Sequence, residues 1–347
     1  MSLKRILLGV VLAVLIGGGI FAYIAYGIFF TPNTSFNGDN EFVFLPTDAS
    51  ENDLEKGLSP LLKNFDAFRS AADRKGYLSN IKAGRYKISK GMNNNEIVNS
   101  LRSGNLPVKV SFNNQESVND LAGRVASQIE ADSSSLVAAF KDTDFLKLNG
   151  FNEANMISPY IPNSYEFFWN TSATAFRDRM LKEYKRFWNE GRIEKAKVLG
   201  LNPNEVIALA SIVHKETAKV DERPTVAGVY LNRLKKGMLL QADPTVIYAI
   251  KKETGNFDTI IKRVLYKDLE MDSPYNTYKY AGLPPGPIAM PDITAIDAVL
   301  NPKKHNYYYF VANVEKFGYH MFAENLTQHN RNKEQYIRWI NAQKINR

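Results

Sequence analysis

The chain has 347 residues, enough for a membrane anchor and two or three compact units that each bury a core. Its 44% hydrophobic and 23% charged residues exclude wholesale disorder, and the absence of cysteine excludes disulfides, thiolate nucleophiles and cysteine metal sites. The net charge of +8 is spread along the chain without a basic run, so nucleic acid is the least expected partner, and charge alone does not choose between a membrane surface and an acidic polymer.

A long apolar segment lies near the N-terminus. Residues 6–30 contain no charged side chain, and as a helix they reach roughly 37 Å, enough to cross a hydrocarbon core. Lys4 and Arg5 precede the segment, so the positive-inside rule places residues 1–5 in the cytoplasm and residues 31–347 outside. A cleaved signal peptide is the alternative, but the run is longer than such signals carry and no clear small-residue cleavage site closes it. We expect a retained, single-pass helix in the inner (cytoplasmic) membrane, with the remainder on the periplasmic side.

Residues 31–112 are predicted to form a polar tether followed by a small α+β unit. Short runs of β-branched and aromatic residues indicate strands, and apolar residues at helical spacing indicate helices between them. The expected strands are 41–45, 83–89 and 108–112, and the expected helices are 52–64, 66–75 and 93–102, the last with Gly104 at its C-cap.

Residues 113–195 are predicted to be a mainly helical linking region, because apolar residues recur there at helical spacing. The segment 158–169 is the exception, since it contains two prolines and many aromatic residues. We expect this segment not to form a plain helix.

The helix predicted next carries the most informative side chain. Asn202 as N-cap, Pro203 in the first helical position and Glu205 in the third are a strong helix start. Residues 206–213 are apolar on every face, which predicts a buried helix, and Glu216 closes its last turn. Burial and the partial negative charge of the helix C-terminus both raise the pKa of a carboxyl group there, toward the range of a general acid. On spacing alone, Glu216 could equally be a solvated residue at the helix end.

Residues 196–347 as a whole are predicted to be a catalytic α+β domain. A second helix begins at Arg223 and ends at Gly237, and a third short helix begins with Asp243 as N-cap and Pro244 as its first residue. Two loops rich in proline, hydroxyl and amide groups follow at 273–278 and 282–288. Proline makes such loops stiff, so they can hold a fixed wall around a ligand, or they can be rigid surface loops without one.

Five sequence blocks resemble successive blocks of the MltG (YceG-like) family of endolytic murein transglycosylases. They are residues 210–217, 229–234, 240–248, 275–278 and 282–288, and residues 308–312, His320 and 326–330 resemble the family's closing segment. The residues 83–86 and 90–92 make the small unit at 31–112 similar to the family's LysM-like subdomain. Two positions depart from the family pattern: His214 stands where glutamate is frequent, and Asn163 stands where aspartate is usual. Glu216 matches the family's catalytic glutamate.

The resemblance implies a membrane-anchored enzyme that cuts the MurNAc–GlcNAc bond of peptidoglycan and leaves 1,6-anhydro-MurNAc ends. In this mechanism Glu216 protonates the leaving oxygen and then accepts the proton of the muramoyl 6-hydroxyl, which attacks its own anomeric carbon. The resemblance also implies a role in terminating nascent glycan strands beside peptidoglycan synthases. Aromatic residues of 158–169 could stack on sugar rings or simply pack on the core. The candidates for sugar binding are Gln241, Asp243, Tyr248, Asn276 and Tyr278, of which Asp243 could instead only cap a helix.

Two other functions stay open from the sequence. The first is a hydrolytic muramidase, which needs a second carboxylate such as Asp243, Asp221 or Glu222. The second is a noncatalytic peptidoglycan-binding scaffold. We expect no cofactor and no catalytic metal, because the four histidines, at 214, 305, 320 and 329, are scattered and no H-E-x-x-H motif is present.

Overall fold

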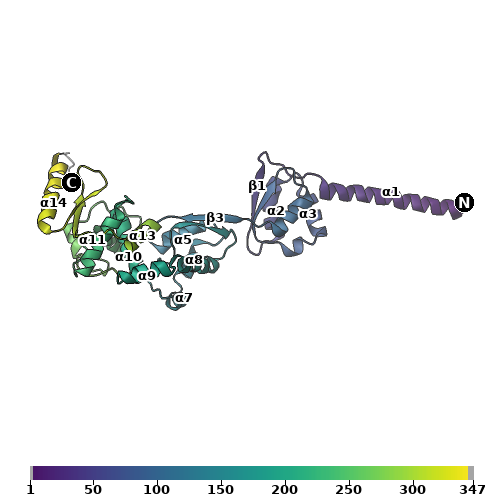
Figure 1. Cartoon of the computed structure of the whole chain (residues 1–347). Coiled ribbons are helices and arrows are strands. Elements are labelled where there is room, and N and C mark those ends of the chain that lie inside the picture. The colour runs from purple at the N-terminus through teal and green to yellow at the C-terminus, as the bar shows by residue number, and fades with distance from the viewer. Residues whose placement is uncertain (1–2, 343–347) are drawn as a thin grey trace. The chain divides into compact units, whose positions relative to one another are not determined.

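The computed structural model describes residues 3–342, which fall into two compact units (Figure 1). The first unit contains the residues up to Val110 together with Ser127–Ala131 and Tyr165–Ser172. The second contains Ser111–Ala126, Asp132–Ser164 and the chain from Ala173 onward. This division places most of the predicted linking region in the same unit as the predicted catalytic domain. The fold is a mixed α+β fold, as predicted.

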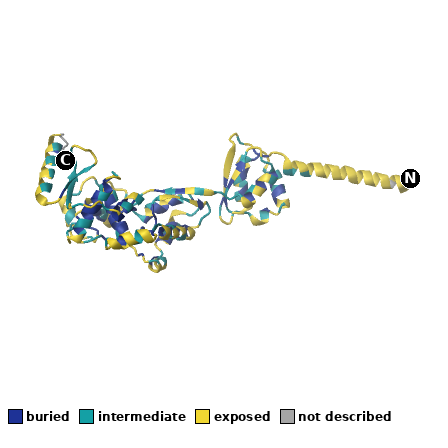
Figure 2. Cartoon of the chain, in the orientation of Figure 1, coloured by how far each residue is buried: buried dark blue, intermediate teal, exposed yellow. Residues whose placement is uncertain are grey.

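The first helix, α1 (Leu3–Phe30), begins slightly before the predicted apolar segment and includes Lys4 and Arg5. Its most apolar window has a mean hydropathy of 2.5 and is entirely unburied, as the exposed colouring along the helix shows (Figure 2). An isolated helix with its apolar side chains exposed on all sides is unfavourable in water. Its length and composition are those of a membrane-crossing helix.

The rest of the first unit confirms the predicted strands and helices closely. Strand β1 (Asn40–Leu45) pairs antiparallel with β2 (Gly84–Ser89), and Val43 lies opposite Tyr86 in this pairing. Gly84 adopts a φ of +147°, and a Cβ atom there would lie 2.4 Å from the Asn105 side chain, whose Oδ1 accepts a hydrogen bond from the backbone N–H of Arg85. Only glycine fits this position. The helices are α2 (Glu51–Leu58), α3 (Phe65–Arg74) and α4 (Asn94–Ser103, with Gly104 as C-cap), and short 3₁₀ turns lie at Ser59–Leu61 and Leu78–Asn80.

The predicted helix 52–64 is shorter in the structure. The α-helical part ends at Leu58, and a 3₁₀ turn with a proline in its first turn follows. Proline lacks the N–H that would continue the α-helix, which explains the early end.

Residues 113–195, predicted to be mainly helical, contain several helices and one strand. Strand β3 (Pro107–Phe112) pairs with β4 (Asn163–Phe168), which lies in the proline- and aromatic-rich segment that we expected not to be a plain helix. The helices are α5 (Val118–Ala126), α6 (Ser133–Phe140), α7 (Thr143–Leu148), α8 (Ala173–Phe187) and α9 (Glu190–Val198).

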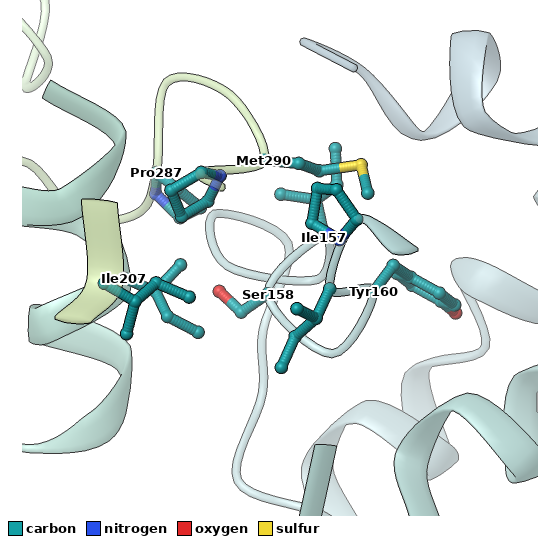
Figure 3. A pocket seen from close by; sticks show the side chains of 10 residues that line it. Ile157, Ser158, Tyr160, Ile207, Pro287 and Met290 are labelled. Atoms are coloured by element: carbon teal, nitrogen blue, oxygen red, sulfur yellow. The ribbon is translucent and has the colours of Figure 1, made fainter. Parts of the chain in front are cut away.

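The segment before β4 packs against the core. The Tyr160 ring lies 4.5 Å from that of Phe140 and stacks on that of Phe176, and Tyr160 is only 2% exposed. Its neighbours Ile157 and Ser158 meet Ile207 and Met290 around a space of about 10 Å³, whose lining side chains are drawn in Figure 3. A space of this size holds at most about one water molecule. Tyr160 therefore packs on the core and does not stack on a sugar ring, the other role considered for the aromatic residues of 158–169.

The core of the second unit surrounds one central helix. Helix α10 (Pro203–Glu216) is buried at every position from Val206 to Val213 and packs against α11 (Arg223–Lys235), α12 (Asp243–Thr254) and α13 (Ile293–Leu300). A short antiparallel pair, β5 (Tyr309–Ala312) and β6 (His320–Ala323), packs with α14 (Leu326–Ala342). The residues between α12 and α13 form loops, as predicted for 273–278 and 282–288, apart from a 3₁₀ turn at Tyr266–Glu270.

Candidate active site

Helix α10 fixes the position of Glu216. At its start, the Asn202 side chain accepts a hydrogen bond from the N–H of Glu205, and the Glu205 carboxylate accepts one from the N–H of Asn202, which is the predicted capping box. The apolar middle of the helix is immobilised in the core. At the other end, the N–H of Thr217 donates to the carbonyl of Val213 and closes the helix directly after Glu216. The carboxyl group therefore projects from a rigid element, which favours precise placement of a reactive group.

The surroundings of Glu216 shift its proton affinity. Burial raises the pKa of Glu216 to about 7, and the nearby Asp243 carboxylate contributes in the same direction. The hydroxyl of Tyr230 donates a hydrogen bond of 2.5 Å to Oε1, and this bond, His320 and Arg233 partly oppose the rise. A carboxyl group with this pKa is protonated in a large fraction of molecules at neutral pH and can act as a general acid.

Glu216 lies in a cavity of about 450 Å³, a volume typical of ligand sites. Its walls come from the ends of α10, α11 and α12, from the loop at Tyr278, and from β5 and α14. The lining residues are Glu216, Tyr230, Arg233, Leu240, Gln241, Asp243, Tyr278, Tyr309, Phe310, Leu326, His329 and Lys333.

Three of the predicted sugar-binding residues line this cavity together with Glu216: Gln241, Asp243 and Tyr278. The expectation that Asp243 is the N-cap of α12 is wrong, because Ala242 holds that position and Asp243 is the first helical residue. The N–H of Ala242 is instead held by the hydroxyl of Thr277. The Asp243 carboxylate accepts a hydrogen bond of 2.5 Å from the hydroxyl of Tyr278, so it is directed to the cavity instead of to its own helix.

Gln241 has an unusual backbone conformation beside the reactive group. Its φ of +49° lies in the left-handed region that residues other than glycine rarely adopt. The conformation is held by a hydrogen bond from its N–H to the carbonyl of Thr277, and its side-chain oxygen lies 3.4 Å from Nη1 of Arg233. Backbone strain of this kind concentrates at functional sites, where surrounding contacts maintain it.

The other two candidates lie elsewhere. Asn276 is fully buried: its amide donates to the carbonyls of Leu269 and Met271, and its oxygen accepts from the N–H of Tyr278. Asn276 thus shapes the loop that presents Tyr278. The Tyr248 ring lies 4.7 Å from that of Tyr275 and 5.8 Å from that of Phe257, and it lines two neighbouring cavities.

The sequence did not single out several residues of the cavity. Nothing in the spacing of Tyr230 indicated that its hydroxyl meets Glu216. Arg233 donates from Nε to the carbonyl of Tyr308 at 2.6 Å and from Nη1 to that of Leu240 at 2.8 Å, which ties α11 to the start of β5 and to the turn at Gln241. On α14, His329 and Lys333 are four residues apart, so they lie on one face of the helix. This spacing was the only feature of the sequence that could have indicated that both residues line the same cavity. His320 and Glu222 form a separate network next to the cavity.

Glu222 connects β6 to the C-terminal end of α10. Its carboxylate accepts hydrogen bonds from the backbone N–H and Nδ1 of His320, at 2.7 and 2.9 Å, and from the hydroxyl of Thr217 at 3.0 Å. Burial alone would raise the pKa of Glu222, but the hydrogen bonds and charge of His320 outweigh it, so the pKa lies below its usual value. Asp221, the third carboxylate considered for a hydrolase, accepts from the hydroxyl of Tyr319. Only Asp243 of the three lines the cavity with Glu216.

His214 lies outside the cavity, next to Arg223 and 3.3 Å from the Asp292 carboxylate. Burial lowers the pKa of His214, so its imidazole is mostly neutral at pH 7. Within residues 3–342, no group of three or more histidine, aspartate or glutamate side chains could hold a metal ion.

Comparison with known proteins identifies the family. The model of the YceG-like family matches residues 43–335. The chain belongs to the YceG-like family. It is 32% identical over 298 residues to a Bacillus subtilis protein named endolytic murein transglycosylase, a match that covers 80% of this chain and 79% of that protein.

Two further comparisons agree with the family assignment. A Streptococcus pneumoniae (strain D39) protein of the same name is 34% identical over 176 residues, which are 51% of this chain and 31% of that longer protein. The 2.6 Å crystal structure of a YceG-like protein from Listeria monocytogenes superposes with a TM-score of 0.57 at 27% identity, covering 84% of this chain and 98% of that one. The resemblance expected from the five sequence blocks is thus confirmed.

Proposed function

We propose that this chain is a membrane-anchored lytic transglycosylase that cuts peptidoglycan glycan strands at internal MurNAc–GlcNAc bonds. The observation that carries the proposal is the carboxyl group of Glu216, held at the end of a buried helix, inside a cavity, with a pKa of about 7. The names of the relatives in Bacillus and Streptococcus support the same reaction.

In the proposed reaction Glu216 acts first as an acid and then as a base. Because the hydroxyl of Tyr230 donates to Oε1, the proton of the neutral carboxyl belongs on Oε2. This proton moves to the oxygen that links the two sugars as the bond to the muramoyl anomeric carbon breaks. The resulting carboxylate accepts the proton of the muramoyl 6-hydroxyl, and that oxygen bonds to the anomeric carbon. The products are a 1,6-anhydro-MurNAc end and a free GlcNAc hydroxyl, and no water is consumed.

The neighbours of Glu216 suit both halves of this cycle. Burial and Asp243 favour the neutral acid, while the hydrogen bond from Tyr230 and the electrostatic effects of His320 and Arg233 favour the carboxylate. The opposing effects keep the two protonation states close in free energy at neutral pH, which one group serving as both acid and base requires. The muramoyl hydroxyl belongs to the substrate itself, so its attack benefits from a high effective concentration.

A hydrolytic muramidase is the second candidate, because Asp243 places another carboxylate in the same cavity. In that reaction Asp243 would activate water or form a covalent intermediate. In our proposal Asp243 has a different role: it accepts a hydrogen bond from Tyr278, and the two side chains together bind a sugar substituent. Gln241 is the third direct contact that we assign to the sugar.

Product analysis of digested glycan separates these functions. We expect the wild-type chain to give anhydro ends and Glu216→Gln to give no cleavage. Glu253→Gln is the matched control, because Glu253 is an exposed residue near the end of α12 and lines none of these walls. Reducing ends would identify a hydrolase, and unchanged activity in Glu216→Gln would refute catalysis at this site.

The proposal places residues 31–347 on the periplasmic side of the inner membrane. The apolar helix α1 and the two basic residues at its start support this orientation. An enzyme tethered by one helix reaches glycan close to the membrane, which fits termination of nascent strands beside peptidoglycan synthases. We assign the small unit that contains β1 and β2 to the LysM-like subdomain of the family, with a role in holding glycan.

A further inference from the structure

Two more cavities are lined in part by the helices that carry Glu216 and Asp243. One of them, the nearer cavity, has a volume of about 360 Å³. It is lined in part by Lys215, which directly precedes Glu216 in the chain, and by Pro244, which directly follows Asp243. Lining residues of this cavity and of the one that contains Glu216 therefore follow one another along α10 and along α12. The farther cavity, of about 320 Å³, shares Glu116, Tyr248 and Phe257 with the nearer one. The two outer cavities thus share a wall, and the nearer one is lined by the chain neighbours of Glu216 and Asp243.

Aromatic side chains stand at the boundary of the two outer cavities. The rings of Tyr248 and Phe257 lie 5.8 Å apart at an angle of 59°, and both residues are partly exposed. Tyr275 supports the Tyr248 ring from behind, with 4.7 Å between ring centres. Partly exposed aromatic rings with fixed support offer apolar contact area at little cost in conformational entropy.

Glu116, Lys215 and Lys251 form an ion triad that lines the nearer cavity. The Glu116 carboxylate lies 2.5 Å from Nζ of Lys215 and 2.7 Å from Nζ of Lys251, so it links the loop before α5 to both α10 and α12. Burial raises the pKa of Glu116, but the two lysines outweigh this effect and the net shift is downward. The carboxylate therefore stays charged, and the triad keeps one positive charge and spare N–H donors. Such donors suit carbonyl oxygens of acetamide groups.

We infer that the two outer cavities form a distal saccharide subsite, which holds N-acetylated sugars of the same glycan strand that is cut at Glu216. The inference rests on the proposed function and names a part of its substrate. The apolar faces of the sugar rings pack on Tyr248 and Phe257, and the lysines of the triad donate to acetamide oxygens. A cut inside a strand requires sugars on both sides of the broken bond, and one cavity of about 450 Å³ cannot hold a long strand. Tyr248, which lines these two cavities and not the one with Glu216, would then bind sugars away from the bond that is cut.

The test compares glycan strands of two lengths on the full chain in detergent. The short strand carries one disaccharide unit on each side of the bond to be cut, and the long strand carries several more disaccharide units. We expect kcat/KM to be higher for the long strand in the wild type. Phe257→Ala should lower kcat/KM for the long strand at least about fivefold through KM and leave the short strand unchanged. Tyr266→Ala is the matched control, since Tyr266 is an aromatic residue of the same segment, is 87% exposed and lines neither cavity.

A binding measurement reads the subsite without cleavage. In the Glu216→Gln background, the long strand should bind more tightly than the short one, and adding Phe257→Ala should remove that difference. An unchanged preference for length in Phe257→Ala would overturn the inference. An equal loss on both strands would overturn it too, because the residue would then act on the reaction and not on distal sugars. A wild-type chain that cuts neither strand would instead refute the proposed function, and the binding comparison would still decide on the subsite.

Discussion

The hydroxyl of Tyr230, in the middle of α11, donates a hydrogen bond of 2.5 Å to Oε1 of Glu216 at the end of α10. This bond stabilises the carboxylate and lowers the pKa of Glu216 against the larger effect of burial. The two residues lie 14 positions apart, and the contact exists because α10 and α11 pack against each other. It links the packing of the core directly to the acid strength of the proposed catalytic group.

Tyr230→Phe should move the pH dependence of cleavage. The substitution keeps the ring in the core and removes the bond that lowers the pKa of Glu216, so this pKa should rise above about 7. Because the first step needs the protonated carboxyl, the alkaline limb of kcat/KM should move to higher pH, while the maximal rate falls. The pH profile of kcat/KM measures this shift. A limb that stays in place or moves to lower pH would show that Tyr230 does not act on Glu216.

Glu216→Gln should stabilise the fold at alkaline pH. The carboxyl has an ordinary pKa of 4.5 when unfolded and about 7 when folded, so the folded state binds more protons between these values. The stability of the wild type therefore falls as pH rises from 4.5 to 7 and stays low above it, by on the order of 1–3 kcal/mol. Glutamine avoids this cost. Thermal unfolding at pH 5 and pH 8 should show a gain in Tm for the variant mainly at pH 8, and an equal Tm difference at both pH values would contradict the raised pKa.

Asp243→Asn distinguishes the roles proposed for the two carboxylates. Asparagine retains an oxygen that accepts the hydrogen bond from Tyr278, so we expect cleavage to persist with a loss of no more than about tenfold. The negative charge of Asp243 also raises the pKa of Glu216, so its removal should move the alkaline limb to lower pH, opposite to Tyr230→Phe. Rates and pH profiles on the same glycan measure both effects. A loss as complete as that of Glu216→Gln would favour a two-carboxylate hydrolase.

Glu222→Gln should weaken the fold near the site. The carboxylate is 5% exposed and accepts three hydrogen bonds, two from His320 and one from Thr217. Replacing it with an amide should cost about 1–3 kcal/mol of unfolding free energy at pH 7. Because the folded pKa of Glu222 lies below its usual value, this stability is present above about pH 4.5 and is lost as pH falls through the folded pKa. Chemical denaturation of both chains at pH 7 measures the difference. An unchanged midpoint, with Glu253→Gln as control, would show that the network contributes nothing.

The structure of α10 was predictable because its signals are local. The capping residues Asn202 and Glu205 lie within one turn, and the apolar run fixes which part is buried. The position of Glu216 at the end of that run follows from counting residues. Likewise, the strands around Gly84 were found because short alternating runs and turn residues suffice to define them.

The composition of the cavity was not predictable because it depends on long-range packing. Nothing local distinguishes Asn276, which is buried and shapes a loop, from Tyr278, which faces the cavity two residues later. Gln241 adopts a left-handed conformation just before α12, which begins one residue earlier than expected, and its N–H donates to the carbonyl of the distant Thr277. The wall formed by β5 and α14 depends on how the last part of the chain packs. Sequence therefore singled out Glu216, and packing supplied the groups that shift its pKa.

Mass spectrometry of purified glycan digested by the full chain and by Glu216→Gln is the decisive measurement of catalysis at Glu216. We expect 1,6-anhydro-MurNAc ends with the wild type and intact strands with the variant, whose fold remains cooperative in thermal unfolding. Reducing MurNAc ends from the wild type, or anhydro ends released at an undiminished rate by Glu216→Gln, would contradict this expectation.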